Sequence, residues 1–342
     1  MADSKRVGFA VVGLGNISEV AVLPAFRHSG KAKLVALVSG DARKAKRLAG
    51  KFGASDYYSY DDYVLCLNHP QVDAVFIATT NGTHADLAIR AARAGKHVLC
   101  EKPMANTVED CQQMIAACRG SDVRLMIAYR KYFDPASLAL KRLITTGKLG
   151  RVKLLHSAFT IFLPPGRGVP AWHFSRKQAG GGSLYDVGVY CVNTSRWLIG
   201  KDPTEASAQA WTFDPARYNE VEENIAFQLK FPGGIVLQGS SSFGLAQASY
   251  LYVHGEKGWA ALNPAYEFND VRRLYGKIGN KSFERKFKPM DEFALELDAF
   301  AGAIRRGRDP EPNGLEGLKD VAVMQAIYKS ARENRPVPIP LA

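Results

Sequence analysis

The chain has 342 residues, of which 46% are hydrophobic and 23% charged, and this composition indicates a folded protein with two domains of ordinary size. Its apolar stretches are shorter than the ~20 residues of a membrane-spanning helix, and its five cysteines form no motif with metal-ligand spacing. The net charge of +12 comes from scattered lysines and arginines without a nucleic-acid-binding motif, so it favours anionic small molecules as partners. The odd number of cysteines, without a CxxC pair, indicates reduced thiols and a cytoplasmic location. From these observations together we expect no metal, no membrane and no nucleic-acid partner.

The first part of the chain, residues 1–130, alternates short apolar strands with helical segments. This alternation predicts an α/β fold of the Rossmann type, with a doubly wound parallel sheet covered by helices on both faces. We expect strands at 7–12, 34–38, 74–78, 97–100 and 125–128, and helices near 17–29, 42–52, 84–95 and 107–119.

A different pattern follows in residues 131–342. After a helix from Pro135 to about Thr146, apolar and polar residues alternate with period two over 224–231, which is typical of a strand with two unlike faces. We therefore expect a second α/β domain with a large, mostly antiparallel open sheet. Its last helices are candidates for packing back on the first domain. Further strands are expected at 152–161, 205–212, 235–242 and 250–254, and final helices at 291–306 and 315–334.

The first strand leads directly into Gly13-Leu14-Gly15-Asn16-Ile17-Ser18. Two glycines between a strand and a helix are the start of a dinucleotide-binding fingerprint, although a serine replaces the third glycine. The first glycine permits a tight turn, the second lets the backbone approach a pyrophosphate, and the helix N-terminus supplies free N–H groups. An ordinary turn between strand and helix is the alternative.

The second strand ends at Ser39-Gly40, where NAD-binding domains usually carry an acid for the ribose 2′-hydroxyl. A hydroxyl followed by the cations Arg43 and Lys44 suits a 2′-phosphate, so the sequence favours NADP over NAD. Asp41, two positions late, is contrary evidence. The two cations could instead lie on the solvated face of a helix.

The segment 179–193 places three glycines before Asp186 and Tyr190, which are four residues apart and so share one face of a helix. A phenol and a carboxylate beside a bare backbone form a plausible proton-transfer site. Two structural alternatives remain open: Asp186 as a helix N-cap and Tyr190 as a core residue.

Another candidate is Glu101-Lys102-Pro103, at the end of an expected parallel strand, where ligands of such folds bind. A solvated charge is the alternative for Lys102. His156, His173 and the loop at 164–168 are further candidates on the substrate side.

Together these motifs resemble the family of glucose-fructose oxidoreductase and inositol dehydrogenase (Gfo/Idh/MocA), and most closely its glucose-fructose oxidoreductase branch. The resemblance covers nearly the whole chain. It rests on the Gly13 turn, Thr80-Asn81-Gly82-Thr83-His84, Glu101-Lys102-Pro103, Tyr129-Arg130, the segment 180–193 and the last helix.

The resemblance implies hydride transfer between a nicotinamide and a sugar. By position, Lys102 would bind the reacting hydroxyl, Asp186 would orient the substrate, and Tyr190 would be the acid/base. It implies further cofactor contacts at Tyr60, Thr79, Asn81, His84, Glu101, Lys102 and Arg130, and a homo-oligomer, dimer or tetramer, assembled through the second sheet. A dehydrogenase of inositols, polyols or dihydrodiols, and a non-catalytic regulator that binds dinucleotide and sugar, are the alternatives.

Overall fold

A computed structural model describes residues 6–166 and 168–340, and the chain divides into two compact units. The first unit comprises Met1–Arg130 and Asp291–Leu318, and the second comprises Lys131–Met290 and Lys319–Ala342. The late segment 291–318 thus belongs with the N-terminal unit. In the described part of the chain, no helix is both long and apolar enough to cross a membrane.

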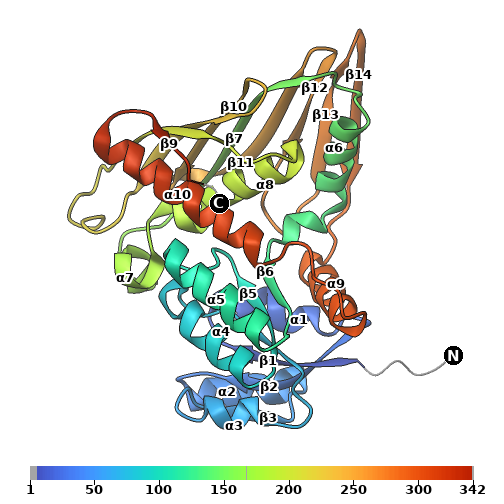
Figure 1. The fold of residues 1–342 in the computed structure, drawn as a ribbon, viewed down its shortest axis with the longest axis vertical. Helices are drawn as coiled ribbons and strands as arrows, with labels where there is room; N and C mark the ends of the chain where they lie inside the picture. The colour runs from blue at the N-terminus through green and yellow to red at the C-terminus, as the bar shows by residue number, and fades with distance from the viewer. Residues whose placement is uncertain (1–5, 167, 341–342) are drawn as a thin grey trace, which may run out of the picture. The chain divides into compact units, whose positions relative to one another are not determined.

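The first unit is built on a six-stranded, wholly parallel sheet in the order β3-β2-β1-β4-β5-β6 (Figure 1). The order reverses between β1 and β4, so the predicted doubly wound fold is confirmed. Every residue of β1 is buried, as expected of a central strand covered on both faces. The strands are β1 (Val7–Val12), β2 (Ala32–Val38), β3 (Asp56–Tyr58), β4 (Ala74–Ile77), β5 (His97–Glu101) and β6 (Leu125–Ala128).

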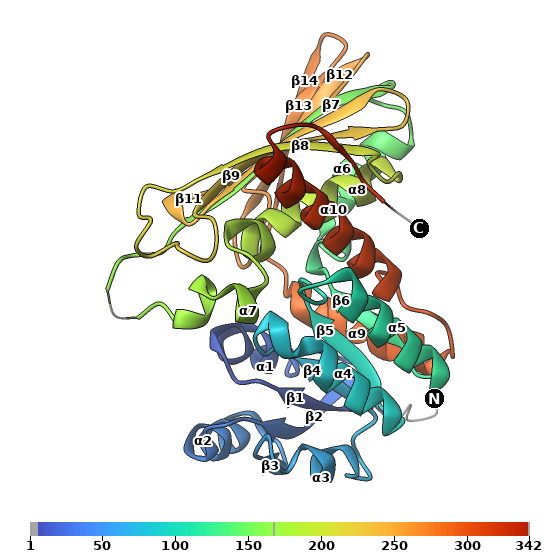
Figure 2. The ribbon, with the colours of Figure 1, turned by 60° about the vertical axis from the view of Figure 1, so that its left-hand side comes forward.

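Helices cover this sheet, and their ends follow local capping chemistry. The Asp41 carboxylate accepts a hydrogen bond from the Lys44 N–H at 2.9 Å and begins α2. The late helix α9 packs Phe300 against Phe9 of β1, with ring centroids 6.2 Å apart. Figure 2 shows α4 and α5 beside β4 and β5. The helices are α1 (Leu23–Ala25), α2 (Ala42–Phe52), α3 (Tyr63–Leu67), α4 (His84–Arg93), α5 (Val108–Gly120) and α9 (Glu292–Arg305).

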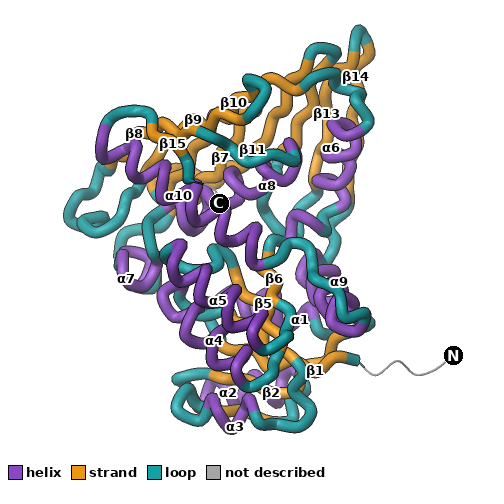
Figure 3. The backbone as a smooth tube through the Cα atoms, viewed as in Figure 1, coloured by secondary structure: helices purple, strands orange, loops and turns teal. Residues whose placement is uncertain are grey.

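The second unit contains a nine-stranded sheet in the order β14-β13-β12-β11-β7-β10-β9-β8-β15 (Figure 3). Neighbouring strands are antiparallel except β7 and β10, so the expected mostly antiparallel sheet is confirmed. The strands are β7 (Val152–Phe162), β8 (Glu205–Trp211), β9 (Asn224–Phe231), β10 (Ile235–Ser242), β11 (Gly244–Gly255), β12 (Gly258–Asn263), β13 (Arg272–Ile278), β14 (Lys281–Phe287) and β15 (Val337–Pro338).

One face of this sheet is covered by helices α6 and α8 (Figure 1). The opposite face carries Gln228, Gln238 and the aromatic ring of Tyr250, which are exposed. A π-helical turn, η5 (Leu184–Gly188), runs directly into α8. The helices are α6 (Pro135–Thr145), α7 (Arg176–Ala179), α8 (Val189–Ile199) and α10 (Gly314–Glu333), and the division between the units falls within α10.

Candidate functional site

The glycine turn after β1 has the geometry that a pyrophosphate requires. Gly13 has φ +93°, and a Cβ there would lie 2.5 Å from the carbonyl oxygen of Ala78, so the position demands glycine. A Cβ on Gly15 would meet no atom within 4 Å, so space is open in front of its backbone. Asn16 is exposed and Ile17 partly so, at the start of the π-helical turn η1 (Ser18–Val22).

Ser18, which replaces the third glycine of the fingerprint, stabilises this turn. Its side chain is fully buried, and its hydroxyl donates to the Gly13 carbonyl oxygen at 2.7 Å. From the sequence, this serine was only a replacement for the third glycine of the fingerprint. The hydrogen bond shows that it also fixes the turn, which therefore fits a bound dinucleotide.

The end of β2 brings together the residues expected at the adenosine ribose. Asp41 is engaged as the N-cap of α2, and its own N–H lies 3.1 Å from the Ser39 hydroxyl, which accepts from it. Lys44 forms an ion pair of 3.4 Å with Glu19, whereas Arg43 is exposed and pairs with no carboxylate of the described residues. A Cβ on Gly40 would lie 3.4 Å from the ring of Tyr60.

His84 joins the loops that follow β4 and β5. Its ring is fully buried, with Nδ1 3.1 Å from the Pro103 carbonyl oxygen and Nε2 3.2 Å from that of Thr79. Burial lowers the pKa of His84 to about 4, so the ring is neutral near pH 7. Asn81, in the segment that follows β4, is also buried.

A buried cluster of acidic side chains lies near the carboxyl ends of β5 and β6, where Lys102 follows Glu101. Glu101 accepts a hydrogen bond from the Lys102 N–H at 3.2 Å, and Arg130 pairs with Glu292 at 2.6 Å. Glu296 is fully buried one helical turn after Glu292.

Neither carboxylate oxygen of Glu296 has a hydrogen-bond partner among the described residues. Burial, and then the charge of Glu101, hold the pKa of Glu296 well above its usual value. Sequence reasoning missed both helix glutamates, although two acids four residues apart among mostly apolar helix residues were a visible signal.

Asp186 and Tyr190 lie where a π-helical turn becomes a regular helix. Asp186 is partly exposed inside η5, whose N-cap is Ser183, so the alternative of Asp186 as an N-cap is wrong. Tyr190 is 8% exposed, and its ring lies 5.7 Å from the rings of both Phe159 and Tyr266. π-Helical turns occur often at functional sites.

The remaining second-unit candidates lie in separate places. His156 and Ser157 are neighbours in β7, so their side chains lie on opposite faces of the sheet. The ring of His156 lies on the open face and meets that of His254 edge-on, with ring centroids 5.5 Å apart. His173 stacks on Trp172 at 3.8 Å. Around the loop at 164–168, Arg217 donates to the carbonyl oxygen of Pro164 at 2.9 Å; Arg167 lies outside the described residues.

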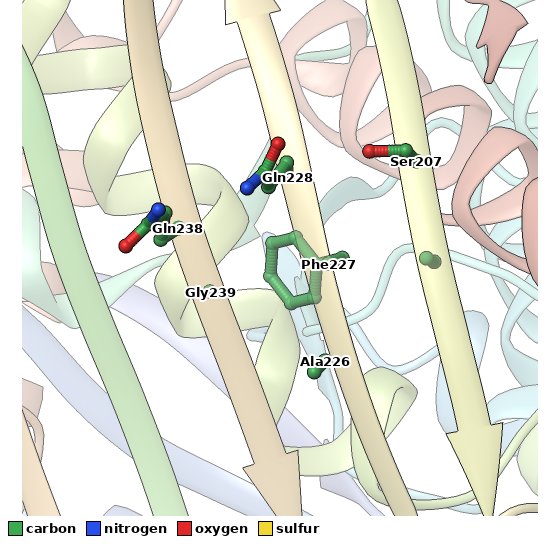
Figure 4. Close-up of a pocket in the computed structure, with 7 residues that line it drawn as sticks. Ser207, Ala226, Phe227, Gln228, Gln238 and Gly239 are labelled. Carbon is green, nitrogen blue, oxygen red and sulfur yellow. The ribbon is translucent and has the colours of Figure 1, made fainter.

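A shallow hollow on the nine-stranded sheet offers no proton-transfer group (Figure 4). The ring of Phe227 takes the place of a side chain at Gly239, where a Cβ would lie 2.2 Å from its Cζ atom. None of the lining side chains titrates. They are Ser207, Ala208, Ala226, Phe227, Gln228, Gln238 and Gly239.

Comparisons with known proteins match both units. Residues 7–129 match the model of an oxidoreductase family with an NAD-binding Rossmann fold, and residues 137–261 match the Gfo/Idh/MocA C-terminal domain. The chain is 29% identical to D-xylose 1-dehydrogenase [NADP(+)] of Haloarcula marismortui, over 98% of this chain and 94% of that protein.

Two further relatives match over nearly their full length. An uncharacterized oxidoreductase of Rhizobium meliloti is 31% identical, over 96% of this chain and 98% of that protein. The crystal structure of aldose-aldose oxidoreductase from Caulobacter crescentus, complexed with glycerol, superposes with a TM-score of 0.93 at 36% identity. That match covers 98% of this chain and 100% of the crystallised chain.

Proposed function

Because this chain belongs to the Gfo/Idh/MocA family of NAD(P)-binding oxidoreductases, we propose that it is an NADP-dependent sugar oxidoreductase. Hydride passes between the nicotinamide and an aldopyranose C1 hydroxyl or a keto-sugar carbonyl. The observation that carries this proposal is the open backbone of Gly15 at the carboxyl end of β1. The names of two relatives, a D-xylose 1-dehydrogenase and an aldose-aldose oxidoreductase, support an aldose as substrate.

The arrangement at the end of β2 supports NADP as the cofactor. Asp41 was the evidence for NAD, but its carboxylate is the N-cap of α2 and so already has a hydrogen-bond partner. Ser39 and the exposed Arg43 would bind the 2′-phosphate, and Tyr60 would lie against the adenosine. Lys44 would contribute less, because Glu19 holds it in an ion pair. The D-xylose dehydrogenase relative is named as an NADP(+) enzyme.

The proposed chemistry divides between the two units of the chain. The bound nicotinamide supplies the hydride acceptor or donor. Lys102 binds the reacting hydroxyl, whose proton must leave as the hydride is transferred. Tyr190 removes that proton in oxidation and returns it in reduction, while Asp186 orients the sugar.

We also propose that the chain assembles as a dimer or tetramer through the open face of the nine-stranded sheet. Tyr252 stacks on Trp259 there, with ring centroids 6.1 Å apart, and Tyr250 is 37% exposed. Exposed aromatic rings of this kind favour burial in an interface. Light scattering of the purified protein should give a multiple of the 37.4 kDa chain mass, and a monomeric mass would contradict the proposal.

The functional test is the absorbance of reduced nicotinamide while the purified protein is offered NADP⁺ or NAD⁺ with a panel of aldoses, inositols and other polyols. We expect turnover with at least one aldose and with NADP⁺ over NAD⁺. Turnover with only polyols or dihydrodiols would show that the substrate is not a sugar of the proposed class but a polyol or dihydrodiol. Saturable NADP binding without turnover of any compound would identify a non-catalytic regulator instead.

A further inference from the structure

The start of the helix that carries Asp186 and Tyr190 is held by one carboxylate from a distant segment. Glu222 Oε1 accepts from the Leu184 N–H at 2.8 Å, and Oε2 accepts from the Gly182 N–H at 3.0 Å. Oε2 also accepts from the hydroxyl of Tyr328 in α10 at 2.7 Å. We call Glu222 and Tyr328, with the backbone they hold, the Glu222 clamp.

The clamp explains two of the three glycines in this segment. A Cβ on Gly182 would lie 1.9 Å from the carbonyl oxygen of Glu222, and a Cβ on Gly181 would lie 2.1 Å from the hydroxyl oxygen of Tyr328. Neither glycine has a positive φ. The sequence suggested that this bare backbone admits a ligand, but protein atoms fill the space beside both glycines.

The first N–H groups of a helix have no partner within the helix. The Glu222 carboxylate accepts hydrogen bonds from one such group, that of Leu184, and from the Gly182 N–H just before it, and therefore acts as an N-cap. Removal from water raises the pKa of Glu222, while the hydrogen bonds from Leu184, Tyr328 and Gly182 lower it. Burial and the nearby Glu222 charge hold the pKa of Tyr328 well above its usual value, so its hydroxyl remains a donor.

The rest of the helix is anchored separately. Asp320 accepts from Asn193 Nδ2 at 2.7 Å and from Arg196 Nη1 at 2.5 Å, which joins the later turns of α8 to α10. Loss of the Glu222 clamp would therefore free the π-helical turn that contains Asp186 and leads into Tyr190, and leave the later turns of α8 in place.

We propose that Glu222 and Tyr328 are positioning residues that fix Asp186 and Tyr190 in the geometry required for proton transfer. This inference rests on the proposed function, in which these two side chains act on the substrate. Misplacement of a reacting group by about 1 Å can cost on the order of a hundredfold in rate. The clamp should thus govern kcat without governing cofactor affinity.

The primary variant is Tyr328→Phe, which removes one hydroxyl and retains the ring that stacks on Tyr185 at 5.8 Å. We expect kcat to fall by about tenfold to a hundredfold, with the KM for NADP within about twofold of the wild-type value. Ser330→Ala is the matched control, because its hydroxyl, on the same helix, bonds Ala208 and Arg335 instead. Wild-type kcat in Tyr328→Phe, or an equal loss in Ser330→Ala, would overturn the proposal.

A second variant and an activity-independent measurement separate this inference from the proposed function. In Glu222→Gln an amide nitrogen replaces one accepting oxygen, so at least one of the three donors loses its partner. Amide hydrogen exchange over 182–188 should accelerate in Glu222→Gln and Tyr328→Phe but not in Ser330→Ala.

If the wild-type protein turns over no substrate, the proposed function fails, while the exchange measurement still tests the clamp. Unchanged exchange in both variants would show that the clamp does not hold this turn. Faster exchange with unchanged kcat would show that holding it does not position the reacting groups.

Discussion

Replacing Glu296 by glutamine should abolish a pH-dependent loss of stability in the first unit. The carboxyl group is fully buried on α9, near Glu101, Glu292 and Arg130, and it has no hydrogen-bond partner among the described residues. The two neighbouring acids raise its pKa and Arg130 opposes them, with burial as the largest cause. The native protein therefore retains this proton at a pH where the unfolded chain has released it.

This difference in bound protons determines how the free energy of unfolding changes with pH. The unfolded pKa is near 4.5, so the stabilisation is complete below about that pH and is lost as pH rises toward the raised native value. Each pH unit within that window costs about 1.4 kcal/mol. Even one such unit is a noticeable part of the about 5–15 kcal/mol typical of a whole domain. Glutamine has no such proton, so the variant escapes this cost.

The assay is urea unfolding of the wild type and Glu296→Gln between about pH 5 and about pH 8, followed by circular dichroism. The wild type should lose stability relative to the variant as pH rises. All four tryptophans lie in the second unit, so tryptophan fluorescence reports that unit separately. Glu109→Gln, an exposed position on α5, is the control for the change of charge alone. Parallel stability curves for the wild type and Glu296→Gln would refute the reasoning.

Three further predictions concern the residues proposed to bind the cofactor and to act on the substrate. Tyr190→Phe and Lys102→Met should each lower kcat by about a hundredfold or more while NADP affinity, measured by titration, stays within a few fold; near-wild-type turnover in either would contradict the assignment. Gly15→Ala should keep the wild-type melting temperature but weaken NADP binding, because the space in front of Gly15 is open. Gly13→Ala should lower the melting temperature, because its Cβ would clash with the carbonyl of Ala78. Equal effects of the two variants would contradict the difference between these two glycines. His84, with its pKa lowered to about 4 from 6.5, should make the first unit lose stability as pH falls through that interval, by about 1.4 kcal/mol per unit, and acid melts of His84→Gln should show a shallower slope.

The alternation of apolar strands and helices was enough to predict most of the first unit. β1, β6 and α2 begin and end at the expected residues, because each has a continuous apolar or amphipathic pattern. β3 and α3 were not predicted. β3 is a three-residue edge strand with one exposed tyrosine, so its sequence carries no burial pattern to recognise.

The second sheet was harder to predict at its outer strands. β12, β13 and β14 were missed, although they form one end of the sheet. In β14 charged and exposed residues dominate, because this edge strand has only one neighbour and little buried surface. The sequence of these seven residues alone therefore does not predict that the segment pairs with β13.

For the candidate site, the sequence showed the local motifs but not the distant residues that hold them in place. Gly13, Lys102 and Tyr190 stand in short patterns that a reader of the sequence can recognise. The partner that holds Gly182 lies 40 residues away in Glu222, and the next lies 146 residues away in Tyr328. No local pattern encodes contacts of that range, so the clamp became visible only in the folded chain.

The π-helical turn η5 sets the angular relation between Asp186 and Tyr190, the two side chains proposed to act on the substrate. A π-helical turn holds more residues than an α-helical one, and so behaves as a residue inserted into the helix. One residue corresponds to about 100° of rotation around an α-helix axis. Asp186 lies inside the turn and Tyr190 just beyond it, so deleting one residue there would swing the carboxylate away from the phenol while both side chains remained. If these two side chains act on the substrate as proposed, the insertion or deletion of one residue in this turn would change their alignment without replacing either of them.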